Sequence, residues 1–258
     1  MYHTTGFSKA EIVDICSRVE AMFPSKQRTT GRKPALGLFK SVVVTLAYLR
    51  RNRVQQELAE YFGASQSTIS RAITTFVPIL AAVLADWIPT VDDLDQKAQY
   101  IIDGTLLTCW SWRNRPELYS GKHHTTGVNV QVACTLDGDL AWVSDPLPGS
   151  THDATAIRES GFLDQPETGK EPPRHLGDKG YIGLGMITPK KKPAGLPMPD
   201  TDKQYNKQVN QIRYMVERAV ANFKTWRILH TDYRRPFNTF AETISAVIAL
   251  EFFRSALF

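Results

Sequence analysis

Four carboxylates stand on segments of different types, in positions where a metal ion or an acid could act. Asp103 follows two isoleucines and precedes Gly104, which predicts a place in or at the end of a buried strand, where an unpaired carboxylate is costly. Asp153 falls at the expected first turn of a helix, and Asp178 stands between glycines that permit a sharp turn close to a ligand. Glu217 lies in a long amphipathic segment.

Each carboxylate also has a purely structural explanation. Asp153 could cap its helix, Asp178 could serve a turn, and Glu217 could pair with Arg213. Taken together, oxygen ligands from a strand, a turn and a helix suit Mg²⁺ or Mn²⁺ better than zinc. No histidine pair has HExxH spacing, and the three cysteines are far apart, so neither a zinc site nor a disulfide framework is supported.

The segment around Glu217 also predicts nearby positive charge. Residues 204–229 have the pattern of one long amphipathic helix. At about 100° per residue, Arg213, Glu217 and Lys224 share one face of that helix, while Val216 and its apolar neighbours face a core. Lys224 would therefore stand beside the glutamate, where an ammonium group can bind a phosphate.

A second motif lies in residues 55–72, which fit a helix-turn-helix position by position. Ala59 is small where two helices must cross, Gly63 sits at the turn, and Ser65 can cap the second helix. The second helix would present four side chains able to bond base edges or phosphates, Gln66, Ser67, Ser70 and Arg71. The alternative is two helices that only pack against their neighbours, because that pattern is also common.

The net charge of +5, from 31 basic and 26 acidic residues, is a weak indication of a polyanionic partner. The basic excess is concentrated in residues 1–56 and 179–235, which suits a partner long enough to touch both regions. Candidate DNA contacts outside the helix-turn-helix are the basic residues Arg51, Arg53, Lys122, Lys190, Lys191, Arg213 and Lys224, with the stretch 26–33 and Arg113, Arg115, Lys192, Arg234 and Arg235 as further basic positions. Trp110, Trp112 and Trp226 could stack on an unpaired base, although core packing is the more common role.

The hydrophobic periodicity divides the chain near residue 90. Helical patterns fill residues 1–90, and strand patterns over residues 100–110, 128–136 and 140–144 begin a second domain over residues 98–258, which ends with an apolar helix over residues 240–258. No apolar run approaches the roughly 20 residues of a membrane span, and no signal peptide is evident. These patterns predict a soluble, cytoplasmic protein with no membrane partner.

The ordered residues Ile102-Asp103-Gly104-Thr105, Pro148 to Asp153, Leu176 to Tyr181 and Arg213-x3-Glu217-x6-Lys224 resemble those of DDE transposases, in particular the insertion-sequence-five group and its Harbinger-like relatives. The resemblance extends from the helix-turn-helix to about Phe240. It implies an α/β, RNase H-like core, a mixed sheet flanked by helices, following an all-α helix-turn-helix domain. One departure is Asn210, where the family pattern usually has tyrosine.

This resemblance implies a transposase that binds the terminal inverted repeats of its element and cuts and joins DNA strands with divalent metal. Asp103, Asp178 and Glu217 would be the catalytic metal ligands, with Asp153 a fourth ligand or a site organiser, and Arg213 and Lys224 would be the basic residues that flank the glutamate. The cofactor would be Mg²⁺ or Mn²⁺, as two ions. The partners would be double-stranded repeat and target DNA and further copies of the chain, with the protein nucleoid-associated when bound to DNA.

Two alternatives stay open at the level of the sequence. One is an endonuclease of the same fold that takes no part in transposition. The other is a domesticated DNA-binding protein whose nuclease site is silent, although the presence of all four carboxylates speaks against it.

Overall fold

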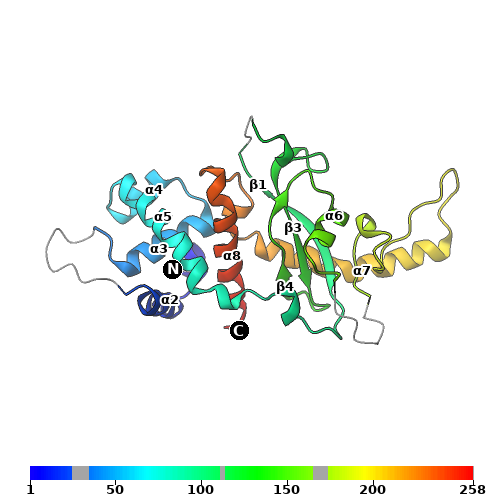
Figure 1. Cartoon of the computed structure of the whole chain (residues 1–258), viewed down its shortest axis with the longest axis horizontal. Helices are drawn as coiled ribbons and strands as arrows, with labels where there is room; N and C mark the ends of the chain where they lie inside the picture. The colour runs from blue at the N-terminus through cyan, green and yellow to red at the C-terminus, as the bar shows by residue number, and fades with distance from the viewer. Residues whose placement is uncertain (25–34, 111–113, 165–173, 258) are drawn as a thin grey trace. The chain divides into compact units, whose positions relative to one another are not determined.

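The computed structural model describes residues 1–24, 35–110, 114–164 and 174–257. It consists of two compact units, of which the first combines Met1–Ile88 with Lys224–Phe258 and the second spans Pro89–Phe223 (Figure 1). The basic stretch 26–33, Trp112 and Arg113 lie outside the described residues.

The first unit is entirely helical in its described part. Its helices are α1 (Tyr2–Thr5), α2 (Lys9–Met22), α3 (Leu38–Arg51), α4 (Gln55–Phe62), α5 (Gln66–Val83) and α8 (Phe240–Ser255), with single 3₁₀ turns at Ala85–Trp87, Arg227–Leu229 and Phe237–Thr239. Helix α8 is apolar on nearly every side and packs against α5, while α3 packs against α1, α2 and α5 (Figure 1). The C-terminal helix, which the sequence pattern assigned to the second domain, therefore completes the core of the first unit.

The core of the first unit is built around Trp226. Its indole ring is fully buried and lies against Phe7, with the ring centroids 6.1 Å apart, while the guanidinium of Arg50 lies 5.1 Å from the same ring. The indole Nε1 donates a hydrogen bond of 2.7 Å to Oε2 of Glu251, and Arg254 donates one of 2.6 Å to the other oxygen of that carboxylate. Trp226 is thus a core residue and has no face available for stacking on a base.

The second unit is an α/β structure. Its strands are β1 (Ile101–Thr108), β2 (Tyr119–Ser120), β3 (Thr125–Cys134), β4 (Leu140–Val143) and β5 (Leu147–Pro148), its helices are α6 (Asp153–Glu159) and α7 (Asp200–Phe223), and 3₁₀ turns lie at Val91–Asp93, Pro116–Leu118 and Lys179–Tyr181. Strand β3 is central and pairs antiparallel with the other four strands. A parallel bridge from Leu176 to Ile101 adds a further segment on the other side of β1, so the sheet is mixed.

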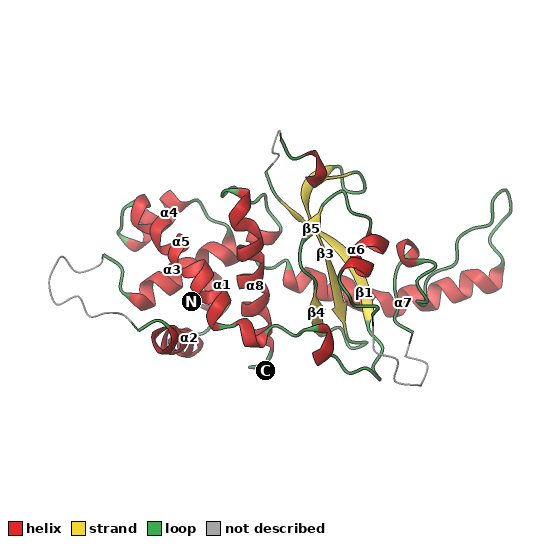
Figure 2. Cartoon of the chain, in the orientation of Figure 1, coloured by secondary structure: helices red, strands yellow, loops and turns green. Residues whose placement is uncertain are grey.

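Alternation along β1 divides the core of the second unit into two layers (Figure 2). Ile102 packs with Ile157 of α6 on one face of the sheet, and Ile101 packs with Val216 and Ala219 of α7 on the opposite face. Because successive side chains of a strand point to opposite faces, the two helices cover opposite sides of β1. This arrangement confirms the expected α/β, RNase H-like class, with a helical N-terminal region.

Helix α7 differs from the helix that the sequence predicts. It begins at Asp200 and ends at Phe223, so Lys224 lies just beyond it and belongs to the first unit. The chain turns there because Trp226 and Ile228 are buried in the first unit rather than continuing the apolar face of α7. Throughout the described ranges, none of the helices has both the length and the apolar character needed to cross a membrane.

Candidate DNA-binding and carboxylate sites

Helices α4 and α5 form the predicted helix-turn-helix. Gly63 ends α4 with φ of 61° and ψ of 41°, a left-handed conformation that side chains disfavour. Oγ of Ser65 accepts a hydrogen bond of 3.3 Å from the backbone N–H of Thr68 and caps α5. Ala59 and Ile69 are buried where the two helices meet. The turn and its cap therefore hold the second helix at a defined angle to the first.

The polar face of α5 carries the residues expected to contact DNA. Gln66, Ser67 and Arg71 are exposed and Ser70 is partly exposed. The side-chain amide of Gln66 donates a hydrogen bond of 3.1 Å to Gln55 of α4, which orients it. This arrangement leaves hydroxyl, amide and guanidinium groups along one helix face, the set that reads base edges and phosphates.

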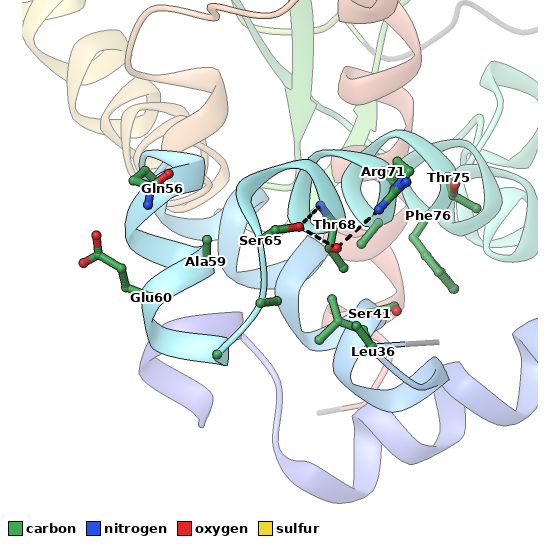
Figure 3. A pocket seen from close by; sticks show the side chains of 14 residues that line it. Leu36, Ser41, Gln56, Ala59, Glu60, Ser65, Thr68, Arg71, Thr75 and Phe76 are labelled. Atoms are coloured by element: carbon green, nitrogen blue, oxygen red, sulfur yellow. Dashed lines mark hydrogen bonds between the residues drawn. The ribbon is translucent and has the colours of Figure 1, made fainter. Parts of the chain in front are cut away.

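A cavity of about 960 Å³ adjoins this helix (Figure 3). Thr68 and Arg71 of α5 lie on one wall, where the guanidinium of Arg71 is 3.4 Å from Oγ1 of Thr68, and Gln56 and Glu60 of α4 lie on another. The mixture of one guanidinium, one carboxylate and several hydroxyls favours a polar surface groove over a site for an apolar ligand.

Other basic residues of the first unit form hydrogen bonds or ion pairs within the unit. Arg51 donates to the backbone carbonyl of His3, and Arg53 lies 3.4 Å from the carboxylate of Glu57, with both side chains more than half exposed in that pair. Arg235 donates a hydrogen bond of 3.0 Å to Thr74, an exposed residue of α5. The sequence identifies Arg235 only as a basic residue. Its position beside α5, the second helix of the helix-turn-helix, follows from the packing of the C-terminal segment in the first unit.

Asp103 and Asp178 lie on neighbouring strand segments. The parallel bridge between Ile101 and Leu176, supported by a hydrogen bond of 2.8 Å from Ile102 N–H to Leu176 O, puts each aspartate two residues beyond the bridge. Both positions therefore project toward the face that α7 covers. The backbone N–H of Gly180 donates a hydrogen bond of 2.6 Å to Asp178, which orients its carboxylate.

The segment before Asp178 is anchored by His175. Its Nδ1 accepts a hydrogen bond of 3.2 Å from the backbone N–H of Tyr100, and its ring packs 5.2 Å from that of Phe162. Burial lowers the pKa of His175 to about 4, so the ring is neutral at physiological pH and keeps its acceptor nitrogen. This histidine serves the structure and is not a metal ligand.

Arg213 of α7 supplies positive charge to the carboxylate pair. Its guanidinium lies 3.8 Å from Oδ2 of Asp103, with only 16% of the arginine side chain exposed. Burial, with smaller contributions from Asp178 and Asp153, raises the pKa of Asp103 to about 6, although Arg213 and Lys122 oppose the rise. Among the described residues, Nε of Arg213 is a buried donor with no hydrogen-bond partner. The site thus combines carboxylates that repel one another with a buried donor that has no partner among the described residues.

Asp153 lies on the other side of the sheet from Asp103. A Cβ atom on Gly104 would come within 2.1 Å of Oδ1 of Asp153, so the carboxylate packs against the bare backbone on the face opposite to the side chain of Asp103. Lys122 Nζ lies 2.7 Å from its Oδ2, and Nδ2 of Asn129 lies 3.0 Å from its Oδ1. Burial opposes its charge, but these hydrogen bonds hold the pKa of Asp153 below its usual value.

A polar chain behind Asp153 was not anticipated. Tyr181 OH donates a hydrogen bond of 2.6 Å to Gln131, and Gln131 donates one of 2.9 Å to Asn129, so three side chains lead from the turn after Asp178 to Asp153. The available signal was the alternation in Val128-Asn129-Val130-Gln131-Val132, which places two amides on one face of an otherwise apolar strand. Buried amides in such a strand require partners.

Replacement of Gly104 by alanine is expected to lower the free energy of unfolding by about 1–3 kcal/mol, because the new methyl group must displace the Asp153 carboxylate and the amide of Gln131, 2.9 Å away. Urea unfolding followed by circular dichroism measures this. Gly121→Ala is the matched control, since a Cβ atom at this position would have no neighbour within 4 Å among the residues that the structure describes. Equal stability of the two variants would contradict the close packing at Gly104.

Glu217 lies on α7, and Lys224 follows the end of that helix. Glu217 is exposed on α7, one helical turn after Arg213, and Lys224 lies beyond the helix end, so their predicted common face does not extend to the lysine. In the part of the chain that the structure describes, no three His, Cys, Asp or Glu side chains gather closely enough to hold a metal ion. Asp103 and Asp178, as partly buried oxygen donors of like charge, do fit one hard divalent cation.

The remaining basic residues of the second unit are on its surface. Lys190 Nζ lies 2.6 Å from Asp202 and is 5.3 Å from the ring of Tyr205, whereas Lys191 is exposed. Trp110 is 54% exposed, so its ring is accessible, unlike that of Trp226. Lys122 is half exposed while bound to Asp153.

The two units thus define a class of protein, a helix-turn-helix module joined to an α/β unit with an acidic site. Comparison with known families agrees. Residues 102–251 match the family described as DDE superfamily endonuclease, and residues 34–86 match the helix-turn-helix of DDE superfamily endonuclease. The chain therefore belongs to the DDE superfamily of endonucleases.

Three similar proteins cover most of the chain. A protein assigned as the transposase for insertion sequence element IS112 of Streptomyces albus G is 31% identical over 77% of this chain and 73% of its own length. One assigned as the transposase for element IS702 of Microchaete diplosiphon is 25% identical over 83% and 80%, and one assigned as the nuclease HARBI1 of Mus musculus is 23% identical over 78% and 62%. No solved structure matches the chain.

Proposed function

We propose that this chain is the transposase of an insertion sequence, which binds the terminal inverted repeats of its element and cuts and rejoins DNA strands. The observation that carries the proposal is the placement of Asp103 and Asp178 side by side on the face under α7, in a chain that also contains a complete helix-turn-helix. The two relatives assigned as insertion-sequence transposases support it.

Asp103 and Asp178 would hold a divalent cation, Mg²⁺ or Mn²⁺, with Glu217 as the third carboxylate and two ions in the working site. Such ions supply activation of the attacking hydroxyl and stabilisation of the leaving oxygen of a phosphodiester. Because burial raises the pKa of Asp103 to about 6, this carboxylate is half protonated near that pH and becomes increasingly ionised as the pH rises above it. Arg213, 3.8 Å away, favours the ionised form.

The remaining groups of the site would bind and orient DNA. The guanidinium of Arg213 lies 3.8 Å from Asp103 and its Nε has no partner in the described part of the chain, so a phosphate oxygen that enters the site could accept a hydrogen bond from this arginine. Water would be the nucleophile for cleavage and a DNA 3′-hydroxyl the nucleophile for joining, so the reaction requires no serine or cysteine. All three cysteines are buried, in keeping with this.

The first unit would recognise the repeats through Gln66, Ser67, Ser70 and Arg71, with Arg51 and Arg53 on the phosphates. Arg71→Gln is expected to weaken DNA binding and to lower the slope of log affinity against log salt concentration by about 0.9, the value of one lost phosphate contact. Fluorescence anisotropy across a salt series measures both. Lys9→Gln, an exposed lysine on α2, serves as the control and should leave the slope unchanged.

The decisive assay for the function uses DNA that flanks the reading frame. The purified protein should cut at short inverted repeats in Mg²⁺ or Mn²⁺ and not in EDTA, and the cut ends should join to a second DNA. Cutting without joining would indicate an endonuclease outside transposition, and binding without cutting would indicate a silent site. We further propose that the protein acts as a multimer in the cytoplasm. Analytical ultracentrifugation of the DNA complex measures how many copies of the chain it contains.

A further inference from the structure

A small pocket opens beside the sheet on the face opposite to Asp103. Its volume is about 250 Å³, and it lies between the loop that follows β2 and the loop that precedes α6. Several side chains that can donate hydrogen bonds line it, among them Ser120, Lys122, His123, Ser150 and Thr151, together with the carboxylate of Asp153. A pocket with this lining suits an anionic ligand.

The walls of the pocket are held rigidly. A Cβ on Gly149 would come within 2.4 Å of the carbonyl oxygen of Leu118, so the two loops are in direct backbone contact. The backbone N–H of Ser150 donates a hydrogen bond of 3.0 Å to Glu117 O, and Asn129 donates one of 3.0 Å to Thr151 O. The pocket is therefore present without any rearrangement.

Both carboxylate oxygens of Asp153 already accept hydrogen bonds. Lys122 engages Oδ2 at 2.7 Å and Asn129 engages Oδ1 at 3.0 Å, and only 12% of the aspartate side chain is exposed. The bare backbone of Gly104 lies under the carboxylate, which separates it from the face where Asp103 projects. The position of Asp153 is thus set by the sheet, and its Oδ2 is bound to Lys122.

The polar chain behind Asp153 fixes its direction. The hydroxyl of Tyr181 donates to Gln131, and Gln131 donates to Asn129, so the Asn129 oxygen is occupied and its amino group must point to Asp153. Tyr181 and Gln131 are fully buried. Because Tyr181 lies three residues after Asp178, this chain connects the turn that carries Asp178 to the ammonium group of Lys122.

We propose that the pocket binds one backbone phosphate of the DNA strand, with Lys122 as its cationic ligand and Asp153 as the residue that positions Lys122. This inference rests on the proposed function and assigns Asp153 a role other than metal binding. An ammonium group has three donors, and the contact to Asp153 uses one of them. The other two, on a side chain that is 54% exposed, are available to phosphate oxygens.

The role of Lys122 is tested by DNA binding in EDTA, with a fluorescein-labelled duplex from the DNA that flanks the reading frame. Lys122→Gln should lower the salt slope of binding by about 0.9, and Lys122→Arg, which keeps the charge, should restore it. Lys203→Gln is the matched control, since Lys203 forms an exposed ion pair of 2.8 Å with Asp200 in the same unit. An unchanged slope in Lys122→Gln overturns the proposal.

The positioning role of Asp153 is tested with duplexes that carry one neutral methylphosphonate at successive positions. The wild-type protein should lose about tenfold in affinity at one position, the value of one charged hydrogen bond. In Lys122→Gln, the loss of affinity should no longer depend on the position of the methylphosphonate. In Asp153→Asn, the loss should be spread over neighbouring positions. The double variant should behave as Lys122→Gln does. A sharp wild-type profile in Asp153→Asn overturns the positioning role.

The metal assignment is separated by thermal unfolding of the DNA complex with and without Mn²⁺. Asp153→Asn should keep the stabilisation by Mn²⁺ that the wild type shows, whereas Asp178→Asn should lose it. Loss of this stabilisation in Asp153→Asn would make Asp153 a metal ligand and overturn the inference. If both variants keep the stabilisation by Mn²⁺, the proposed carboxylate site is contradicted. The phosphate pocket is not, because its binding tests are made in EDTA and do not depend on a metal ion.

Discussion

Asp178→Asn is expected to reduce the rate of DNA cleavage by about 10²–10³-fold, the cost of losing one group that stabilises developing charge. The affinity for DNA should stay within a few-fold of the wild-type value. The asparagine has the same shape and can still accept the hydrogen bond from Gly180 N–H, so the turn is preserved. What it removes is the charge beside Asp103. The measurements are cleavage of a labelled duplex in Mn²⁺ and anisotropy in EDTA.

Asp137→Asn is the matched control for this experiment. Asp137 is an exposed carboxylate in the turn between β3 and β4 of the same unit, and its backbone carbonyl, not its side chain, receives the hydrogen bond from Arg218. The substitution should leave both cleavage and binding unchanged. Undiminished cutting by Asp178→Asn would exclude Asp178 from the active site and with it the carboxylate pair as the site of the chemistry.

Glu251→Ala is expected to lower the free energy of unfolding by about 3–5 kcal/mol, the usual cost of removing one partner from a buried ion pair. The carboxylate is only 4% exposed and accepts hydrogen bonds from both Trp226 and Arg254. Without it, the buried indole N–H and a largely buried guanidinium lose their acceptor in the core of the first unit. Urea unfolding monitored by tryptophan fluorescence reports this loss.

Two variants on the same helix sharpen the test. Glu251→Gln keeps an acceptor for Trp226 but removes the charge that faces Arg254, so it should fall between the wild type and Glu251→Ala. Glu242→Ala removes an exposed glutamate from the first turn of α8 and should cost less than about 1 kcal/mol. A similar loss in Glu251→Ala and Glu242→Ala would show that the buried network contributes little.

The buried contacts of Trp226 and Glu251 also support the helix-turn-helix. Phe7 near the N-terminus packs against both Trp226 and Phe253, with ring centroids 6.1 Å apart in each case. The recognition helix α5 packs against α8. A fragment limited to residues 1–90 would therefore expose apolar surface that the C-terminal helix covers in the whole chain, and disruption of Glu251 should weaken DNA binding through loss of the folded unit.

Much of the local structure followed from patterns within short segments. The small residue, glycine and serine at positions 59, 63 and 65 predicted a helix-turn-helix, and the structure confirms the buried crossing, the left-handed turn and the cap. The apolar run before Asp103 predicted a strand, and β1 spans Ile101–Thr108. These predictions held because turn geometry, capping and strand alternation depend on neighbouring residues alone.

The sequence by itself thus determined the types of the elements, the helix-turn-helix and the presence of carboxylates on strand, turn and helix. Only the tertiary structure decided that Asp103 and Asp178 share one face of the sheet while Asp153 lies on the other with Lys122, and that α8 completes the first unit. Helical spacing could not show that α7 stops at Phe223, before Lys224. The physical reason is that the hydrophobic periodicity of a segment depends on the residues of that segment alone. The partners of its side chains depend on burial and hydrogen bonding between segments that are far apart in the chain.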